Sequence, residues 1–452
     1  MKKLLPRSPQ TLPHSPKVVS VAFGTPTNPI VMDLPQKDGS TYAAPPEVVS
    51  PTTSTPRKWR IALYSHDTMG LGHKRRNLLI AQALGYSTLP ADILMISGMN
   101  DASNGSMPPG VDYLTLPALY KGIDGQYQPR RWDISLKEII ALRSQVIRAT
   151  IATFKPDVLI VDNVPRGAVR ELDPTLEYLR EHGTTRCILG LRDILDDPAI
   201  VRRDWERAAN DEAIRKYYDA VWIYGDPSVY DITRECRFAP DVAAKFHHIG
   251  YLDQRFRLKF ADESATIANI ALPPGRLAVC MVGGGQDGAR LAEAFARSER
   301  PPDTNGVILT GPLMPAKLRQ RLQGYAAQSS RLTVLDYLAE PTLLLEQADW
   351  VVSMGGYNTI CEILSFEKRA LIVPRIKPRR EQLIRAERLQ QLGIVDVLHP
   401  DRLSPIAISD WFAQSWASPL IRDRLDLNGL NRLPQLLEAT LTTDHYSTQH
   451  AS

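Results

Sequence analysis

Residues 350–362, WVVSMGGYNTICE, contain the pattern that decides the fold. A short apolar run ends at Ser353, the pair Gly355-Gly356 follows, and a helical spacing of apolar residues begins directly after it. Buried parallel strands are continuous apolar runs, and glycines allow the backbone to turn sharply from a strand into a helix. The stretch therefore predicts one strand–turn–helix unit of an α/β domain with a parallel sheet.

The same alternation extends in both directions from this stretch. In the C-terminal half the predicted strands are 277–282, 307–310, 333–335, 350–353 and 370–373, and the predicted helices are 287–297, 315–327, 341–347, 358–366 and 380–392. In the N-terminal half the predicted strands are 61–65, 92–96, 111–116, 158–161, 187–191 and 220–224, and the predicted helices are 73–85, 135–153, 168–181 and 203–218. This predicts two Rossmann-like, doubly wound parallel-sheet domains that face a cleft, with ligands at the carboxyl ends of the strands.

Changes in composition mark the predicted domain boundaries. Residues 1–57 hold 11 of the 35 prolines and no periodic apolar pattern, which is typical of a disordered tail. We predict an N-terminal domain over 58–252, a connector over 253–274 and a C-terminal domain over 275–420. Residues 421–452 are predicted to form a helix and a tail, and we expect the helix to pack back on the N-terminal domain.

The composition is that of a globular protein and argues against several classes of function. The 54 basic and 50 acidic residues leave a net charge of +4, which gives no reason to expect nucleic acid as a partner. The four cysteines form no CxxC pair, so neither a metal site nor a disulfide framework is predicted. The sequence lacks an apolar run long enough to span a membrane, and prolines from Pro6 onward interrupt any signal peptide. We therefore expect a cytoplasmic protein.

Three glycine-bearing loops follow predicted strands and precede predicted helices. They are 68–73 (TMGLGH), 283–289 (GGGQDGA) and 353–359 (SMGGYNT). Such loops place backbone N–H groups at a helix N-terminus, where an anionic phosphate binds. Glycines in these turns can also serve only the close packing of helix and strand, and this alternative stays open for each single loop. No loop ends in the Gly-Lys-Ser/Thr of a P-loop, and the first lacks the GxGxxG spacing of a dinucleotide site.

Residues 332–395 resemble the donor domain of glycosyltransferase family 28. This family includes the peptidoglycan N-acetylglucosaminyltransferase that completes lipid II and the plant monogalactosyldiacylglycerol synthases. The resemblance is carried by 334–338 (VLDYL), 348–353 (ADWVVS), 355–363 (GGYNTICEI), 370–374 (ALIVP) and Glu381-Gln382, and Gly70–His73 and Gly283–Gly288 are similar to two further loops of the family. The resemblance implies a GT-B fold, a nucleotide-sugar donor, expected to be UDP-linked, in the C-terminal half, and an acceptor in the N-terminal half. It also implies an inverting hexosyl transfer without a metal or other cofactor.

The resemblance also implies roles for individual residues of the donor site. In the loops it assigns the nucleotide-sugar to Gly72, Gly283, Gly284, Gly285, Gln286, Asp287, Gly355, Gly356, Asn358 and Thr359. Tyr337 and Leu338 are expected at the uracil, and Glu362 at the ribose hydroxyls. Glu381 and Gln382 are expected at the sugar hydroxyls, where the peptidoglycan enzyme has two glutamines, so the sugar stays open. For Glu362 the alternative is an ordinary glutamate that is favoured only by the helix dipole. For Glu381 and Gln382 the alternative is a solvated helix start.

His73 is the candidate general base, because it ends a glycine loop in the acceptor half and an imidazole can take a proton at neutral pH. It could instead bind the departing phosphate or only cap its helix. Asp193, which follows the strand 187–191, and His66 are the other candidates for the base.

Other interpretations stay open. Arg76, three residues after His73, is also found in nucleotide-sugar hydrolases and epimerases of this scaffold, and a non-catalytic sugar-nucleotide sensor would keep the same donor loops. The basic residues between Arg375 and Arg388 could contact phospholipid headgroups at the inner face of a membrane or a phosphorylated acceptor, or simply form a solvated face. The acceptor could be lipid-linked or a small molecule.

Overall fold

The fold was analysed in a computed structural model that describes residues 57–67, 72–98, 107–122, 126–261, 270, 272–285, 287–338, 340–415 and 420–442. The predicted tail lies outside the described residues except for Arg57. Gln286 and the first part of the first glycine loop, 68–71, also lie outside them.

The described part of the N-terminal half contains a sheet of seven strands in the order β3-β2-β1-β6-β7-β8-β9. Every neighbouring pair in this sheet is parallel, as the continuous apolar runs predict. The strands are β1 (Trp59–Ser65), β2 (Ala91–Ser97), β3 (Val111–Thr115), β6 (Val158–Asp162), β7 (Arg186–Arg192), β8 (Ala220–Tyr224) and β9 (Phe246–His248). A separate antiparallel hairpin consists of β4 (Leu119–Lys121) and β5 (Tyr127–Pro129).

The described part of the C-terminal half contains a second parallel sheet, with six strands in the order β12-β11-β10-β13-β14-β15. These strands are β10 (Arg276–Met281), β11 (Thr304–Leu309), β12 (Leu332–Leu335), β13 (Trp350–Ser353), β14 (Arg369–Ile372) and β15 (Asp396–Val397). The first strand of each half lies inside its sheet with later strands on both sides, which is the doubly wound arrangement. The predicted fold class is confirmed.

Helices lie between most consecutive strands, and the last of them follow the final strand of the C-terminal half. In the N-terminal half they are α1 (Gly72–Gly85), α2 (Leu136–Phe154), η1 (Ala168–Arg170), α3 (Asp173–His182), α4 (Pro198–Ala208), α5 (Asn210–Tyr217), α6 (Ile232–Cys236) and α7 (Pro240–Ala243). After them come η2 (Gln254–Phe260), α9 (Ala289–Ala296), α10 (Ala316–Ala326), α11 (Thr342–Gln347), α12 (Tyr357–Ser365), α13 (Glu381–Gln391), η3 (Pro400–Arg402), α14 (Pro405–Ala413), α15 (Ile421–Arg424) and α16 (Gly429–Thr442).

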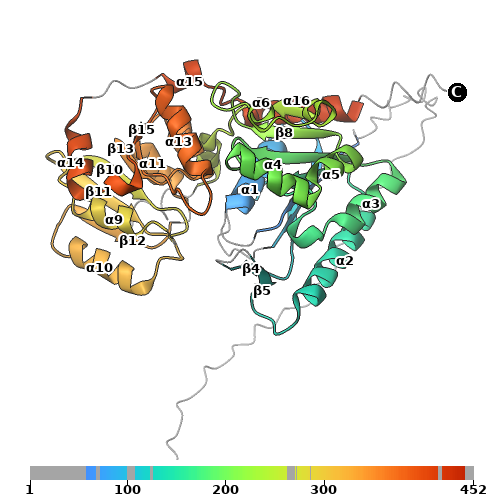
Figure 1. Cartoon of the computed structure of the whole chain (residues 1–452), viewed down its shortest axis with the longest axis horizontal. Helices are drawn as coiled ribbons and strands as arrows, with labels where there is room; N and C mark the ends of the chain where they lie inside the picture. The colour runs from blue at the N-terminus through green and yellow to red at the C-terminus, as the bar shows by residue number, and fades with distance from the viewer. Residues whose placement is uncertain are drawn as a thin grey trace, which may run out of the picture. The chain divides into compact units, whose positions relative to one another are not determined.

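Helices cover both faces of the N-terminal sheet (Figure 1). Along β1, Ile61 and Leu63 belong to a core that includes side chains of α1 and α16, whereas Ala62 and Tyr64 belong to a core that includes side chains of α2 and α3. Because successive side chains of a strand point to opposite faces, a strand that is apolar throughout needs cover on both sides. The four cysteines are free thiols, and each is buried in a hydrophobic core.

Two predicted helices are broken by backbone geometry that the apolar spacing does not reveal. The pattern over 168–181 gives the short 3-10 turn η1 and then α3, because the positive φ angles of Val169 and Arg170 are incompatible with one continuous α-helix. The pattern over 203–218 gives α4 and α5, which are separated by Ala209 at φ 53°. The hairpin of β4 and β5 was not predicted, because its strands are too short to show an alternating pattern.

The segments at the two ends of the C-terminal half pack on other elements. Helix α16 packs against α1, and Arg432 donates a hydrogen bond of 2.8 Å to the carbonyl of Ile249. In the predicted connector, η2 packs against α1, α11 and α12, and the polar side chains of Gln254 and Arg257 are buried. Among the described residues, none of the helices combines the length and apolar character that crossing a membrane requires.

Candidate active site

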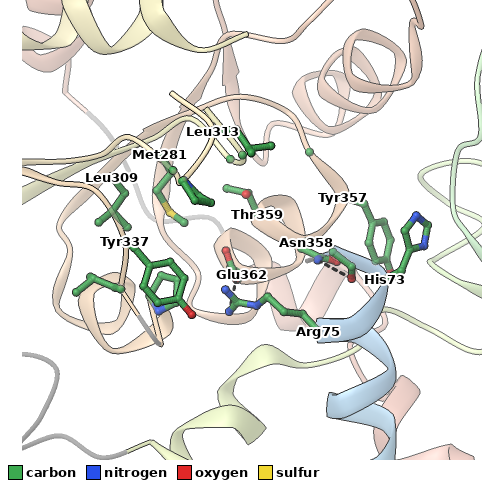
Figure 2. Close-up of a pocket in the computed structure, with 18 of the residues that line it drawn as sticks. His73, Arg75, Met281, Leu309, Leu313, Tyr337, Tyr357, Asn358, Thr359 and Glu362 are labelled. Atoms are coloured by element: carbon green, nitrogen blue, oxygen red, sulfur yellow. Dashed lines mark hydrogen bonds and ion pairs between the residues drawn. The ribbon is translucent and has the colours of Figure 1, made fainter. Parts of the chain in front are cut away.

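Loops at the carboxyl ends of strands from both halves line a pocket of about 410 Å³ (Figure 2). The N-terminal half contributes Gly72, His73, Arg75, Arg76, Arg130 and Arg192. The C-terminal half contributes Met281, Gly283, Gly284, Leu309, Gly311, Pro312, Leu313, Asp336, Tyr337, Leu338, Pro341, Gly356, Tyr357, Asn358, Thr359 and Glu362. We call these two sets the N-terminal wall and the C-terminal wall. The strand ends and glycine loops thus meet where the sequence predicts a ligand site.

The C-terminal wall offers backbone groups and apolar side chains. Gly283 and Gly284 follow β10, and Gly356 is the N-cap of α12 without a side-chain cap hydrogen bond. The first N–H groups of a helix have no partner within the helix, and together with the helix dipole they favour an anion. Met281, Leu309 and the ring of Tyr337 flank this end of the pocket (Figure 2).

Glu362 is the buried carboxylate of the C-terminal wall. Its residue is 3% exposed, and burial raises the pKa of its carboxyl group although the charges of Arg75 and Arg257 oppose this effect. The Nη2 atom of Arg75 lies 3.4 Å from Oε1 of Glu362 and 3.0 Å from Oε1 of Glu340. α12 has no acidic residue in its first turn, so the helix dipole does not explain the presence of Glu362.

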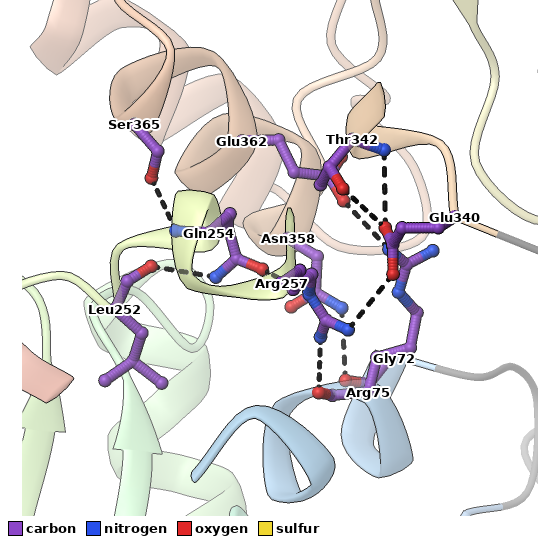
Figure 3. A network of polar contacts seen from close by, with 10 residues as sticks. All are labelled: Gly72, Arg75, Leu252, Gln254, Arg257, Glu340, Thr342, Asn358, Glu362 and Ser365. Atoms are coloured by element: carbon purple, nitrogen blue, oxygen red, sulfur yellow. Dashed lines mark hydrogen bonds and ion pairs between the residues drawn. The ribbon is translucent and has the colours of Figure 1, made fainter. Parts of the chain in front are cut away.

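A polar network around Glu362 joins the two halves (Figure 3). The side-chain amide of Asn358 donates to the carbonyl of Gly72 at 3.1 Å, and Arg257 donates to the carbonyl of Arg75 and lies 3.7 Å from Glu340. These contacts fix the start of α1 against the start of α12. They therefore also fix the position of the predicted donor loop relative to the loop that carries His73.

His73 is oriented by a carboxylate at the end of β6. The ring Nδ1 contacts Oδ2 of Asp162, whose residue is 1% exposed, while Oδ1 of Asp162 accepts from Nε and Nη2 of Arg76 at 2.8 and 2.6 Å. Burial favours the neutral form of Asp162, but the charges of Arg76 and His73 and their hydrogen bonds hold the pKa of its carboxyl group well below its usual range. An ionised carboxylate can only accept, so the contact with Asp162 assigns the hydrogen of the neutral ring to Nδ1 and leaves Nε2 as the acceptor. In this tautomer Nη2 of Arg76, 3.1 Å from Nδ1, is a close neighbour of the ring and not a donor to it.

His66 packs beside this pair without lining the pocket. Its ring centroid lies 4.7 Å from that of His73, and its residue is 6% exposed. Burial and the neighbouring His73 lower the pKa of the His66 imidazole well below its usual range. His66 is therefore a neutral packing partner of His73, and the geometry does not support it as the base.

The structure corrects the candidate role of Asp193, which is fully buried and does not line the pocket. Its carboxylate accepts from Nη2 and Nε of Arg385 at 2.7 and 3.0 Å, and from the hydroxyl of Tyr251 at 3.0 Å. A carboxylate with these partners has no route to an acceptor hydroxyl. Asp193 is part of a buried ion pair between β7 of one half and α13 of the other.

Several predicted donor residues do not line the pocket. Three of them contact Arg375. Its guanidinium donates to Asp287 at 3.3 Å and to Glu381 at 2.6 Å. The backbone N–H of Arg375 donates to the side-chain oxygen of Gln382 at 3.1 Å. Gly355 accepts from Arg385 at 3.0 Å through its carbonyl. A side chain at Gly285 would place Cβ 2.3 Å from the carbonyl oxygen of Thr310, and its φ is 92°, so this glycine is required by the turn itself.

Three of the six basic residues between Arg375 and Arg388 pair with acidic side chains of the N-terminal half. Arg385 pairs with Asp193, Arg380 lies 3.3 Å from Asp197, and Arg388 lies 2.6 Å from Glu235. A solvated face is therefore the wrong interpretation for Arg385, whose side chain is fully buried. The run joins the two halves of the molecule.

Sequence reasoning missed four charged residues of the site: Asp162, Arg75, Arg130 and Arg192. Asp162 and Arg192 are each the last residue of a strand, so a polar residue directly after a predicted apolar strand was an available signal. Arg130 directly follows β5, which the apolar pattern did not reveal. The pairing of Arg75 with Glu340 joins residues 265 positions apart, which no local pattern contains.

Sequence comparisons show which known proteins the chain is similar to. Residues 279–410 match the family model of the glycosyltransferase family 28 C-terminal domain. An uncharacterized glycosyltransferase of Methanopyrus kandleri is 24% identical over 236 residues, which are 50% of this chain and 63% of that protein. The chain thus covers less than two thirds of that curated relative.

Solved structures share the fold over most of the chain. MurG of Acinetobacter baumannii is similar with a TM-score of 0.52 and 13% identity, over 84% of this chain and 99% of the other. The UDP-GlcNAc 2-epimerase of Methanocaldococcus jannaschii is similar with a TM-score of 0.54 and 12% identity, over 85% of this chain and 100% of the other. The predicted resemblance is confirmed: the chain has the GT-B fold, and residues 279–410 are similar to the glycosyltransferase family 28 C-terminal domain.

Proposed function

We propose that this protein is a glycosyltransferase that moves a hexosyl group from a UDP-sugar to an acceptor hydroxyl with inversion. The observation that carries the proposal is that one pocket joins His73, oriented by Asp162, to the uncapped start of α12 and to the buried Glu362. The first element suits a general base, and the other two suit the diphosphate and ribose of a nucleotide donor.

In this proposal the donor lies along the C-terminal wall. The uracil packs beside Tyr337 and Leu338, and the ribose hydroxyls donate to Glu362. The diphosphate lies at the N–H groups of Gly283, Gly284 and the first turn of α12. Arg75 already contacts Glu362, but its contact with Glu340 is shorter, at 3.0 Å against 3.4 Å. Arg75 can therefore shift toward Glu340 when the ribose binds.

The chemical step is a single displacement. The acceptor oxygen forms a bond to the anomeric carbon while the bond from that carbon to the β-phosphate oxygen of UDP breaks. The acceptor proton passes to Nε2 of His73, which Asp162 keeps available as an acceptor. The electron pair of the broken bond stays on UDP, where backbone N–H groups at the start of α12 stabilise the developing charge.

A donor screen tests the donor half of this proposal. UDP-, GDP- and dTDP-sugars are compared for their effect on the melting temperature, and a UDP-sugar should raise it by mass action. Glu362→Ala should abolish most of this increase, whereas Glu346→Ala, an exposed position on α11, should leave it unchanged. A chain that shows no preference for uridine nucleotides contradicts the assignment.

Analysis of the reaction products then distinguishes a glycosyltransferase from a hydrolase, an epimerase or a non-catalytic sensor. A transferase consumes the UDP-sugar at a useful rate only when an acceptor is present. Consumption without an acceptor would instead indicate a hydrolase or an epimerase, the activity in the name of one structural neighbour. A protein that binds the donor and loses no function when His73 is replaced would be a sensor.

A further inference from the structure

Arg192 is a charged residue of the pocket that the proposed donor contacts do not use. It is the last residue of β7, pairs in register with Tyr224 of β8, and lines the N-terminal wall. Its Nε atom is buried without a hydrogen-bond partner, and no carboxylate of the described residues forms an ion pair with it. By contrast Arg75 and Arg76, in the same wall, each contact a carboxylate.

The surroundings of Arg192 are strongly positive. Burial, followed by the charges of Arg76 and Arg385, lowers the pKa of Arg192 to about 10, with a further contribution from Arg379 and an opposing one from Glu381. The guanidinium is still charged at neutral pH. Arg192 is half-buried, and its Nε is fully buried. A partly desolvated cation that has other cations nearby and lacks an acceptor is costly, and an anionic ligand would offset that cost.

The pairing of the strands places Arg192 beside the pair of His73 and Asp162. Arg192 ends β7, Asp162 ends the neighbouring strand β6, and Asp162 lies opposite Gly190 of β7. Glu362 lies instead on α12 of the other half. Arg76 also binds Asp162, which orients His73. Arg192 therefore lies at the His73 end of the pocket, away from the carboxylate assigned to the ribose.

We propose that Arg192 binds an anionic group of the acceptor, a phosphate or a carboxylate, close to the hydroxyl that receives the sugar. The inference rests on the proposed function, in which the acceptor occupies the N-terminal wall. The donor diphosphate has its own N–H donors on the C-terminal wall at Gly283, Gly284 and Gly356. An anion at Arg192 would hold the acceptor beside the base without competing for these groups.

Anion binding to the UDP-loaded protein tests the proposal. The full chain is saturated with UDP and titrated calorimetrically with inorganic phosphate and, separately, with acetate at constant ionic strength. At least one of the two anions should bind. The anion with the higher affinity indicates whether the acceptor group is a phosphate or a carboxylate. Arg192→Gln should weaken that binding at least about tenfold, the scale of a lost charged hydrogen bond, and leave UDP affinity nearly unchanged.

Two variants complete the design. Arg207→Gln removes an exposed arginine of α4 and should change neither affinity, and Arg192→Lys should retain part of the anion binding because it keeps the charge. The proposal is overturned if neither anion binds the UDP-loaded protein. It is also overturned if Arg192→Gln weakens UDP binding as strongly as anion binding, because Arg192 would then serve the donor diphosphate.

Failure of the proposed function gives a different result. A wild-type protein that binds no UDP contradicts the donor assignment. Titration of the nucleotide-free wild type and Arg192→Gln with phosphate then decides the anion site by itself. Equal phosphate affinities of these two proteins would overturn the inference.

Discussion

The two walls of the pocket are built from different chemical groups. The C-terminal wall presents mainly glycine backbone, the start of α12 and apolar side chains such as Met281 and Leu309, and its charged groups are the carboxylates of Glu362 and Asp336. The N-terminal wall presents the imidazole of His73 and four arginines. A wall of backbone and apolar groups is preformed by its sheet, whereas a wall of long charged side chains depends on the partners that orient them.

Because the two walls differ in this way, we expect substitutions in one wall to change donor affinity and substitutions in the other to change turnover. Changes in the C-terminal wall should act mainly on donor binding, because that wall contacts the nucleotide in the proposed complex. Changes in the His73 and Asp162 pair of the N-terminal wall should act mainly on the rate of the chemical step. The buried pair of Asp193 and Arg385 belongs to neither wall and should act on stability.

The largest expected effect is on turnover. In Asp162→Asn the side-chain amide can donate to Nδ1 of His73, which moves the ring hydrogen to Nε2 and removes the proton acceptor. We expect this variant and His73→Ala to lower turnover by about 10²–10⁴-fold, measured as steady-state rates, with little change in UDP affinity.

Asp204→Asn on the surface of α4 is the control, because Asp204 only forms exposed pairs with neighbouring arginines. Melting temperatures should be recorded for all variants, since Asp162 also pairs with the buried Arg76. A folded Asp162→Asn protein with full turnover would remove the pair from the mechanism.

The next effect is on the free energy of unfolding. Arg385→Met leaves the buried carboxylate of Asp193 without its cation, and breaking such a pair costs about 3–5 kcal/mol. Denaturant unfolding should show this loss, and Arg207→Met, at an exposed pair, should lose no more than about 1 kcal/mol. Similar losses in both variants would show that the Asp193–Arg385 pair does not stabilise the contact between the halves.

A smaller effect is expected on donor affinity. Glu362→Ala removes a buried carboxylate from the C-terminal wall and should weaken UDP binding by about 1.5–3 kcal/mol, the scale of a charged hydrogen bond. Calorimetric titration measures this change, and Glu346→Ala is the matched control on α11. Unchanged affinity in Glu362→Ala would place the ribose elsewhere and weaken the distinction between the walls.

The smallest expected effect is the pH dependence of that affinity. Ribose hydroxyls donate best to an ionised carboxylate, and burial raises the pKa of Glu362. As the pH falls through this raised pKa, the ionised fraction decreases and UDP affinity should fall. The fall should begin above the ordinary range of glutamate, about pH 4.3. Subtracting the profile of Glu362→Gln removes the titration of UDP itself, and identical profiles would contradict the prediction.

Much of the C-terminal wall could be predicted from the sequence, because its chemistry is local. The glycines after β10 and β13 and the helix that begins after Gly356 lie in continuous stretches, and the predicted strands and helices there agree with the structure within a few residues. Of the predicted donor residues, Gly72, Gly283, Gly284, Tyr337, Leu338, Gly356, Asn358, Thr359 and Glu362 line the pocket.

The remainder required contacts between distant segments. Asp162 and Asp193 follow or end neighbouring apolar strands and look equivalent in the sequence, yet the first orients His73 and the second binds Arg385. Glu381 and Gln382 match the family by position, but both contact Arg375 and neither lines the pocket.

The sequence by itself therefore determined the two parallel sheets, the glycine turns and the side of the molecule where a phosphate would bind. Apolar runs and glycines act over a few residues, so their pattern is present in the linear chain. The tertiary structure alone decided which charged side chains have partners. Ion pairs such as that of Arg75 with Glu340 depend on distance and burial across the fold, and these quantities exist only once the two halves are packed together.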